Sequence, residues 1–193
     1  MSDFESSSSL ENQFLIAMPQ LRDFFFANSV TLVWKHNSEG ALGIVINKPM
    51  DSVCVADIFK ELDIVPTVDS SQFRSKRVLS GGPVERDKGF IIHDATRTWE
   101  SSISLGPRLS ICTSRQILQD IADGKGPRRY QVALGCAGWD AGQLEREIGE
   151  NAWLTSPADQ ELVFSDDWNN KAAAAAALLG IDLRHLPSAA GHS

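Results

Sequence analysis

The sequence predicts a single α/β (α+β) domain in which a mainly antiparallel sheet is flanked by helices. The chain has 193 residues, 42% of them hydrophobic, which suits one domain with a sizeable core. Short runs rich in β-branched residues recur between turns that contain glycine or proline, as in antiparallel sheets. A few segments place apolar residues at helical spacing behind a capping residue, which predicts amphipathic helices.

We expect this domain to span residues 14–186, because no repeat and no linker rich in proline or serine divides them. The acidic, serine-rich start of the chain predicts a disordered tail over residues 1–13. Residues 187–193 are expected to form a C-terminal tail.

The first strands are predicted from apolar runs. Residues 14–19 are apolar and end in proline, which favours a short buried strand. Residues 30–34 and 42–46 are rich in β-branched residues and enclose the polar, turn-prone segment 36–40. Together they predict a β-hairpin.

A short amphipathic helix is expected over residues 53–62, where apolar residues fall at helical spacing. Asp51 or Ser52 is available to cap it. The polar segment 65–75 has no clear periodicity, so we interpret it as a mobile loop.

The middle of the chain supplies further strands and a second helix. Ser114 can cap a helix that Gly124 and Gly126 end, and residues 130–134 resume a strand. Four short strands are predicted before this helix, over residues 77–80, 89–93, 103–105 and 109–113.

Helical signals dominate the end of the chain. Asp140 and Gln143 have the spacing of a capping box, which predicts a helix over residues 141–150. Ser156 precedes a proline, a pattern that favours a short helical turn. Strong helix formers over residues 169–179 predict a final helix.

Charge and composition restrict which partners and which cellular compartment are expected. The 18 basic and 25 acidic residues give a formal net charge of −7, which disfavours nucleic acid and anionic membranes without excluding a local basic patch. The start of the chain lacks the pattern of a signal peptide, and its longest apolar run, residues 172–179, is too short to span a bilayer. We therefore expect a cytoplasmic protein with reduced cysteines and no membrane partner.

Motifs for common catalytic chemistry are missing from the sequence. It contains no phosphate loop, nucleophile elbow, zinc-protease motif or clustered metal ligands, so we expect no cofactor and no metal. His93 followed by Asp94 could act as a general base. The structural alternative, which we favour, is that the imidazole of His93 forms a hydrogen bond with a local backbone group.

Two glycine-rich segments are more informative. Residues 80–84 follow a predicted strand and could offer backbone amides to an anion, with Arg86 nearby. Residues 135–143 run from a strand into a helix, whose amino terminus could also bind an anion. Both segments are also what a crowded, tightly turned β core needs, and packing is the favoured interpretation.

Several distinctive motifs follow one another along the chain: LIAMPQL at 15–21, GALGIVINKP at 40–49, GGPV at 81–84, GFIIHD at 89–94, LGCAGWDAGQLEREI at 134–148, NAWL at 151–154 and the closing LGIDLRHL with GHS. Over residues 14–193 they resemble the YqgE/AlgH family of bacterial proteins. The family pattern often has proline where this chain has Phe24, and GHA where it ends in GHS.

The resemblance implies an α/β domain around a flattened, mainly antiparallel β-barrel with helices packed outside. Members are described as uncharacterised proteins or transcriptional regulators, and the family brings no catalytic mechanism. The positions expected to line a shared ligand or partner surface are His36, Asn47, Gly81, Gly82, Pro83, His93, Gly138, Trp139 and Gln143.

Three functional hypotheses follow. The leading one is a non-catalytic regulatory or binding protein that holds a small anionic ligand or a protein partner in a cleft beside the GGPV and GCAGWDAGQ segments. The second is a DNA-binding transcriptional regulator, which would need a basic face formed by residues 74–88 and 125–129. The third is a small enzyme that uses His93.

Overall fold

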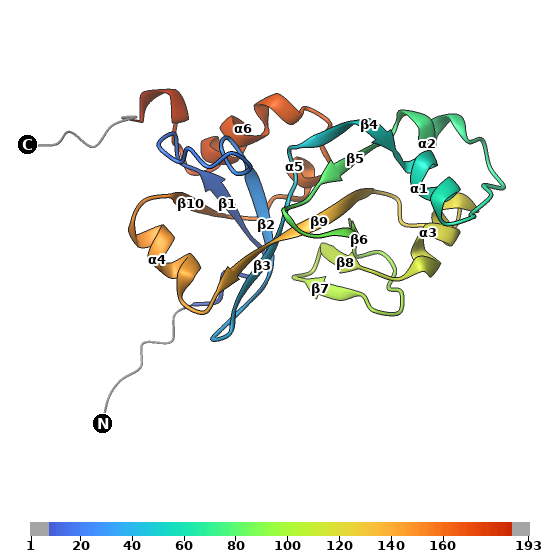
Figure 1. The fold of residues 1–193 in the computed structure, drawn as a ribbon, viewed down its shortest axis with the longest axis horizontal. Helices are drawn as coiled ribbons and strands as arrows, with labels where there is room; N and C mark the ends of the chain where they lie inside the picture. The colour runs from blue at the N-terminus through green and yellow to red at the C-terminus, as the bar shows by residue number, and fades with distance from the viewer. Residues whose placement is uncertain (1–7, 187–193) are drawn as a thin grey trace, which may run out of the picture.

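The fold is a mixed α/β domain built on one curled sheet, as the computed structural model of residues 8–186 shows (Figure 1). Its strands lie in the order β10-β1-β2-β3-β9-β6-β8-β7, and β5 joins β9 and carries β4. The strands are β1 (Gln13–Ala17), β2 (Val30–Asn37), β3 (Gly40–Val45), β4 (Pro49–Cys54), β5 (Arg77–Ser80), β6 (Val84–Asp94), β7 (Ile103–Leu105), β8 (Leu109–Cys112), β9 (Tyr130–Asp140) and β10 (Trp153–Pro157).

The strand pairing confirms the predicted class. The hairpin of β2 and β3 is antiparallel, with Leu32 opposite Ile44, and nearly all other pairs are antiparallel too. The exception is β5, which runs parallel to β9 with Leu79 opposite Ala133. Because the sheet curls without closing by backbone pairing, the expected flattened barrel is observed as a half-barrel.

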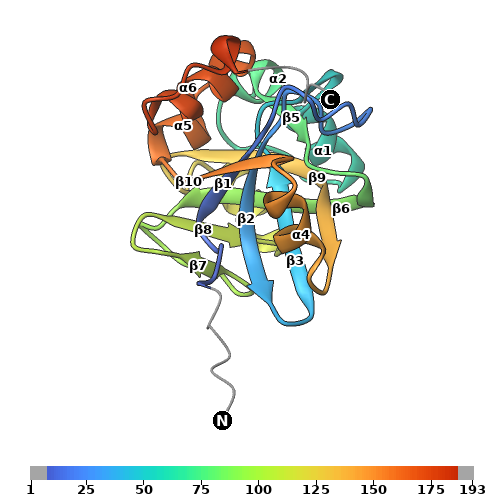
Figure 2. The ribbon, with the colours of Figure 1, turned by 90° about the vertical axis from the view of Figure 1, so that its left-hand side faces the viewer.

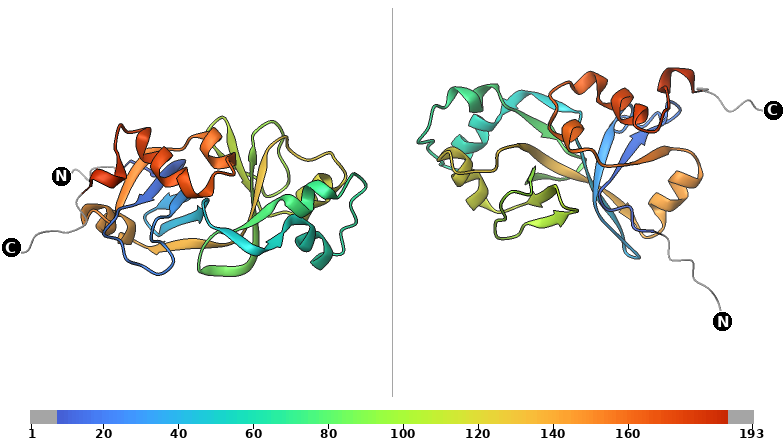
Figure 3. Two further views of the ribbon diagram at one scale, coloured as in Figure 1. Left: turned by 90° about the horizontal axis from the view of Figure 1, so that it is seen from above. Right: turned by 180° about the vertical axis from the view of Figure 1, so that it is seen from behind.

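Within residues 8–186, six α-helices cover both faces of the sheet. In Figure 2, α4 is turned to the viewer and lies against β3, β9 and β10, whereas Figure 3 separates α5 and α6 from α1, α2 and α3 at the far end. The helices are α1 (Val55–Glu61), α2 (Ser71–Ser75), α3 (Arg115–Ala122), α4 (Gln143–Gly149), α5 (Gln160–Phe164) and α6 (Lys171–Ala177).

The core consists of three buried clusters that follow from this arrangement. The inner face of the curl, with Phe14, Leu32 and Phe90, packs against Val163 of α5 and Ala175 of α6. A second cluster joins the outer face of β6 and β9 to α1, α2 and α3. A third cluster lies between β1–β3, β9 and α4. Successive side chains of a strand point to opposite faces of the sheet, so alternate residues belong to different clusters.

Several local predictions are wrong. The cap of α1 is Cys54, which follows strand β4, and neither Asp51 nor Ser52 takes that place. The segment 65–75, interpreted as a loop, ends in helix α2. Ser156 lies in β10 opposite Phe14 of β1, because pairing across the sheet overrides the local helical signal.

The amino-terminal boundary also differs from the prediction. β1 begins at Gln13, and the N–H groups of Leu10 and Asn12 donate to His36 Nδ1 and Val33 O. Part of the segment assigned to a tail is thus bound to β2. The expected tails over residues 1–7 and 187–193, with the closing GHS, lie outside the described residues. None of the helices in the described part of the chain has the length and apolarity that a membrane crossing requires.

Candidate functional site

The nine predicted site residues do not form one site. His36, Trp139 and Gln143 lie around α4, whereas Asn47, His93 and the glycine pair 81–82 occupy separate places. Trp139 also borders a hollow of about 200 Å³ beside the β2–β3 hairpin. The contacts of each residue define its role.

The residues around α4 join that helix to the sheet. His36 Nδ1 accepts the N–H of Leu10 at 3.0 Å, so Nε2 carries the proton and donates to Glu145 Oε1 at 2.6 Å. The carboxylate of Glu147 accepts the indole N–H of Trp139 at 2.9 Å and the side-chain amide of Gln143 at 2.8 Å. Both nitrogens of the imidazole are thus engaged, and these side chains act as structural links.

Asn47 stabilises the loop that leads into β2. Its Oδ1 accepts the N–H of Val30 at 2.9 Å, and its Nδ2 donates to the carbonyl oxygen of Asn28 at 2.9 Å. Asn28 has a φ of 60°, a left-handed conformation that asparagine tolerates better than most residues. The side chain of Asn47 therefore replaces backbone pairing at this turn.

His93 is fully buried at the end of β6. Its Nδ1 lies 2.7 Å from the carbonyl oxygen of Asp94, and its ring packs edge-to-face on Trp99. Burial lowers the pKa of His93, which favours the neutral ring. Burial opposes ionisation of Asp94, yet hydrogen bonds from Thr96 and the N–H of Arg129 outweigh it and lower the pKa of Asp94. The imidazole thus forms a hydrogen bond with a backbone carbonyl group, as the structural alternative predicts.

The glycines of the GGPV segment allow a close approach of two backbones. A Cβ on Gly82 would lie 1.9 Å from the carbonyl carbon of Cys136, and a Cβ on Gly81 would lie 2.3 Å from the oxygen of Gly135. The N–H of Gly81 donates to Leu134 O, so it is not free for an anion. The neighbouring Pro83 is exposed.

The second glycine-rich segment is a strand rather than a turn. Residues 135–140 continue β9, and α4 begins only at Gln143 behind Gly142, which has a φ of 73°. Gly138 lies within the strand, where a Cβ would make only ordinary contacts. Packing, the favoured interpretation, accounts for Gly81, Gly82 and Gly135, whereas close packing does not require a glycine at position 138.

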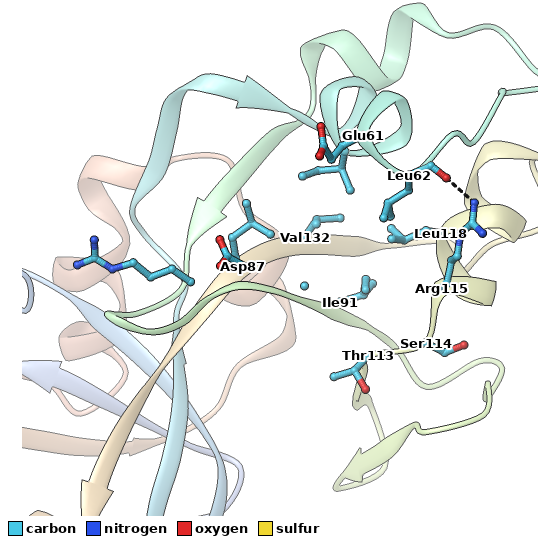
Figure 4. Close-up of a pocket in the computed structure, with 13 residues that line it drawn as sticks. Glu61, Leu62, Asp87, Ile91, Thr113, Ser114, Arg115, Leu118 and Val132 are labelled. Atoms are coloured by element: carbon cyan, nitrogen blue, oxygen red, sulfur yellow. Dashed lines mark hydrogen bonds between the residues drawn. The ribbon is translucent and has the colours of Figure 1, made fainter.

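A cavity of about 520 Å³ lies beside these segments, on the outer face of the sheet (Figure 4). It opens between the end of α1, the start of α3, and strands β6 and β9. Its wall is mostly apolar and comes from Ile58, Leu62, Ile91, Leu118, Val132 and Leu134. Volumes of roughly 300–1,000 Å³ are typical of pockets for small ligands.

Gly89 keeps this cavity open. It belongs to β6 and lines the cavity with Asp87 and Ile91, two residues before and after it on the same face of the strand. A Cβ at Gly89 would meet no atom within 4 Å. A larger side chain at this position would therefore occupy the cavity.

The mouth of the cavity carries charges of both signs. Arg115 donates from its guanidinium group to the carbonyl oxygen of Leu62, as Figure 4 shows, and Arg86 Nε donates to Pro83 O at 3.4 Å. Glu61 and Asp87 approach the mouth from α1 and β6. Among the described residues, neither carboxylate has a hydrogen-bond or ion-pair partner.

Sequence reasoning missed this cavity almost entirely. It singled out Arg86 beside the GGPV segment but none of the apolar residues, because their spacing indicates only core packing. The one local signal is Gly89, a glycine in a predicted strand, which can mark close approach of a ligand or another backbone. The structure places it at the centre of β6, which starts earlier, at Val84, than the strand predicted over residues 89–93.

The basic residues required by the DNA-binding hypothesis are partly engaged. Arg77 donates to the carbonyl oxygens of Met50 and Asp51, and Arg129 forms a bidentate pair with Glu161 at 2.9 Å. Within residues 8–186, no group of three or more His, Cys, Asp or Glu is placed to hold a metal ion.

The curled half-barrel with helices on both faces defines a class of small mixed α/β domains. The chain belongs to the AlgH-like family, whose model matches residues 14–184. It is 44% identical to a UPF0301 protein of Xanthomonas oryzae over 184 residues, which are 95% of this chain and 96% of that protein. A UPF0301 protein of Stenotrophomonas maltophilia is 43% identical over 185 residues, covering 96% and 97% of the two chains.

Solved structures agree with this assignment. The solution structure of the AlgH protein from Pseudomonas aeruginosa matches all of both chains, with 40% identity and a TM-score of 0.78. A crystal structure of a Corynebacterium diphtheriae protein shares the fold at 21% identity and a TM-score of 0.63, covering 78% of this chain and 77% of its own. The family and fold class predicted from the sequence are thereby confirmed.

Proposed function

We propose that this protein is a non-catalytic binding module whose ligand occupies the cavity between α1, α3, β6 and β9. The observation that carries this proposal is a cavity of about 520 Å³ with an apolar wall and a charged mouth. Apolar walls with a few polar groups are typical of ligand pockets, because burial supplies affinity and the polar groups supply orientation.

The position of the cavity supports a refinement of the cleft expected from the sequence. Arg86, Asp87 and Gly89 follow the GGPV segment, and Val132 and Leu134 precede the GCAGWDAGQ segment. The glycines themselves are closely packed, which argues against an anion held by their amides. The ligand is instead expected to contact the side chains on the neighbouring face of β6 and β9.

The state of the two inner histidines supports a non-catalytic role. His93 has no exposed surface, so a substrate cannot reach its imidazole. His36 has a hydrogen bond on each ring nitrogen, one from Leu10 and one to Glu145. Neither ring is available to take a proton from a ligand.

A cytoplasmic location remains part of the proposal. The three cysteines, Cys54, Cys112 and Cys136, are free thiols, which suits a reducing compartment. Burial and the nearby carboxylate of Glu85 raise the pKa of Cys136 to about 11, so its thiol stays protonated near neutral pH.

The test uses a neutral apolar probe, 1-octanol, titrated into isotope-labelled protein and followed by NMR. We expect saturable shifts at Ile91, Leu118 and Val132. Gly89→Leu should abolish them because leucine fills the cavity. Gly149→Leu is the matched control, since Gly149 also has free space around its Cβ position but lies at the end of α4. Shifts that persist in Gly89→Leu, or that are absent from the wild type, would refute the proposal.

A further inference from the structure

We infer that the ligand of this cavity is an amphipathic cation, with an alkyl or aryl body on the apolar wall and an ammonium group at the carboxylates of Glu61 and Asp87. This inference rests on the proposed function, because it specifies the chemistry of the same site. It departs from the anionic ligand that the glycine segments suggested.

The two carboxylates come from different elements, and both residues line the cavity. Glu61 is the last residue of α1, and Asp87 lies on β6 two residues before Gly89. Both residues are exposed, and neither side chain has a hydrogen-bond or ion-pair partner within residues 8–186. Their charges are therefore available to a bound cation.

The two arginines at the mouth already serve the protein. Arg115 donates to the carbonyl oxygen of Leu62, the residue that caps the C-terminal end of α1. Helix C-termini carry unpaired carbonyl groups and a partial negative charge, so the guanidinium group compensates this end of the helix. Arg86 is directed to the carbonyl oxygen of Pro83. An anionic ligand would have to compete with these contacts.

Arg86 precedes Asp87 on β6, whereas Arg115 lies across the apolar wall from that carboxylate. In Figure 4, Asp87 and Arg115 lie on opposite sides of Ile91 and Val132, with Glu61 at the α1 side. A molecule lying on the wall can therefore place a cationic head at the carboxylates and keep it away from Arg115. Exposed ion pairs are weak, so the expected preference for a cation is modest, about three- to tenfold in affinity.

The experiment compares three probes with the same chain and different heads: octylammonium, 1-octanol and octanoate. Each is titrated at one ionic strength, and its affinity is taken from NMR shifts at Ile91, Leu118 and Val132. We expect octylammonium to bind about three- to tenfold more tightly than 1-octanol, and octanoate to bind most weakly. The double variant Glu61→Gln and Asp87→Asn should remove the preference for octylammonium over 1-octanol.

A remote variant controls for attraction to the net charge of −7. Glu150→Gln removes an exposed carboxylate at the end of α4 and should leave the preference intact. If none of the probes shifts the cavity residues, the proposed function fails. If 1-octanol binds but octylammonium shows no advantage, or keeps its advantage in the double variant, only the present inference is overturned.

Discussion

Lys171 allows a quantitative test of how the C-terminal helices are attached. The side chain is only 1% exposed at the start of α6, and Nζ donates to the carbonyl oxygens of Ile46 at 3.0 Å and Val163 at 3.3 Å. The amine also lies 4.6 Å from the centre of the Trp168 ring. Burial lowers the pKa of Lys171 from 10.5 to about 8.

This shift makes the free energy of unfolding depend on pH. Between pH 8 and 10.5 the unfolded chain still binds a proton that the folded protein has released, so stability rises with pH. The gap between the two pKa values corresponds to about 3 kcal/mol. Below pH 8 both states are protonated, and above 10.5 both are neutral, so the contribution is constant outside this window.

The assay is urea unfolding of the wild type and of Lys171→Met between pH 7.5 and 10.5. Other groups also titrate, for burial raises the pKa of Tyr130 to about 12 and that of Cys136 to about 11. Both proteins keep these groups, so their effects cancel in the difference. We expect the stability of the wild type relative to the variant to increase by about 3 kcal/mol. A constant difference would refute the burial argument.

Three further predictions concern packing and reactivity. Gly82→Ala should lower the free energy of unfolding in urea by more than about 4 kcal/mol, because its Cβ would overlap the backbone of Cys136. Gly89→Ala should change this free energy little, and equal losses in the two variants would contradict the packing argument. Glu147→Ala leaves the indole N–H groups of Trp139 and Trp153 without their acceptor, so the free energy of unfolding should fall by about 3 kcal/mol, and by less in Glu147→Gln. An alanine variant as stable as the wild type would contradict this role of Glu147. Iodoacetamide should label Cys54, which is partly exposed, before Cys136, as mass spectrometry of the folded protein can check; the reverse order would disprove the burial argument.

Local sequence patterns were sufficient to predict an element whose structure depends on its own residues alone. The hairpin of residues 30–46 combines two β-branched runs with a polar turn, and it forms as predicted. Ser114 caps α3 by accepting the N–H of Gln116, and Gly124, with a φ of 71°, follows the end of this helix. In both places the residues that meet the backbone requirement lie next to, or inside, the element that they define.

Pairing partners far along the chain decide the remaining elements. Ser156 and Pro157 favour a helical turn locally, but β10 completes the sheet edge by pairing with β1, with Pro157 opposite Gln13. Gly135 is typical of a turn, yet it lies within β9 and must be glycine there, because the segment that follows β5 passes close to it at Gly82. A glycine requirement of this kind is visible only when the second backbone is in place.

The candidate site was the hardest part to predict, and residue types explain why. Histidine, tryptophan and glycine attract notice in a sequence, but here His36, Trp139 and Gly82 are required by hydrogen bonding and close packing inside the fold. The cavity wall is made of leucine, isoleucine and valine, which look like ordinary core until the structure shows that the end of α1 and the start of α3 leave them uncovered. A binding surface made of such common residues exists only because the helices do not cover that part of the sheet. Gly89, for which no other backbone requires a glycine, is therefore the position at which the binding hypothesis is most directly tested.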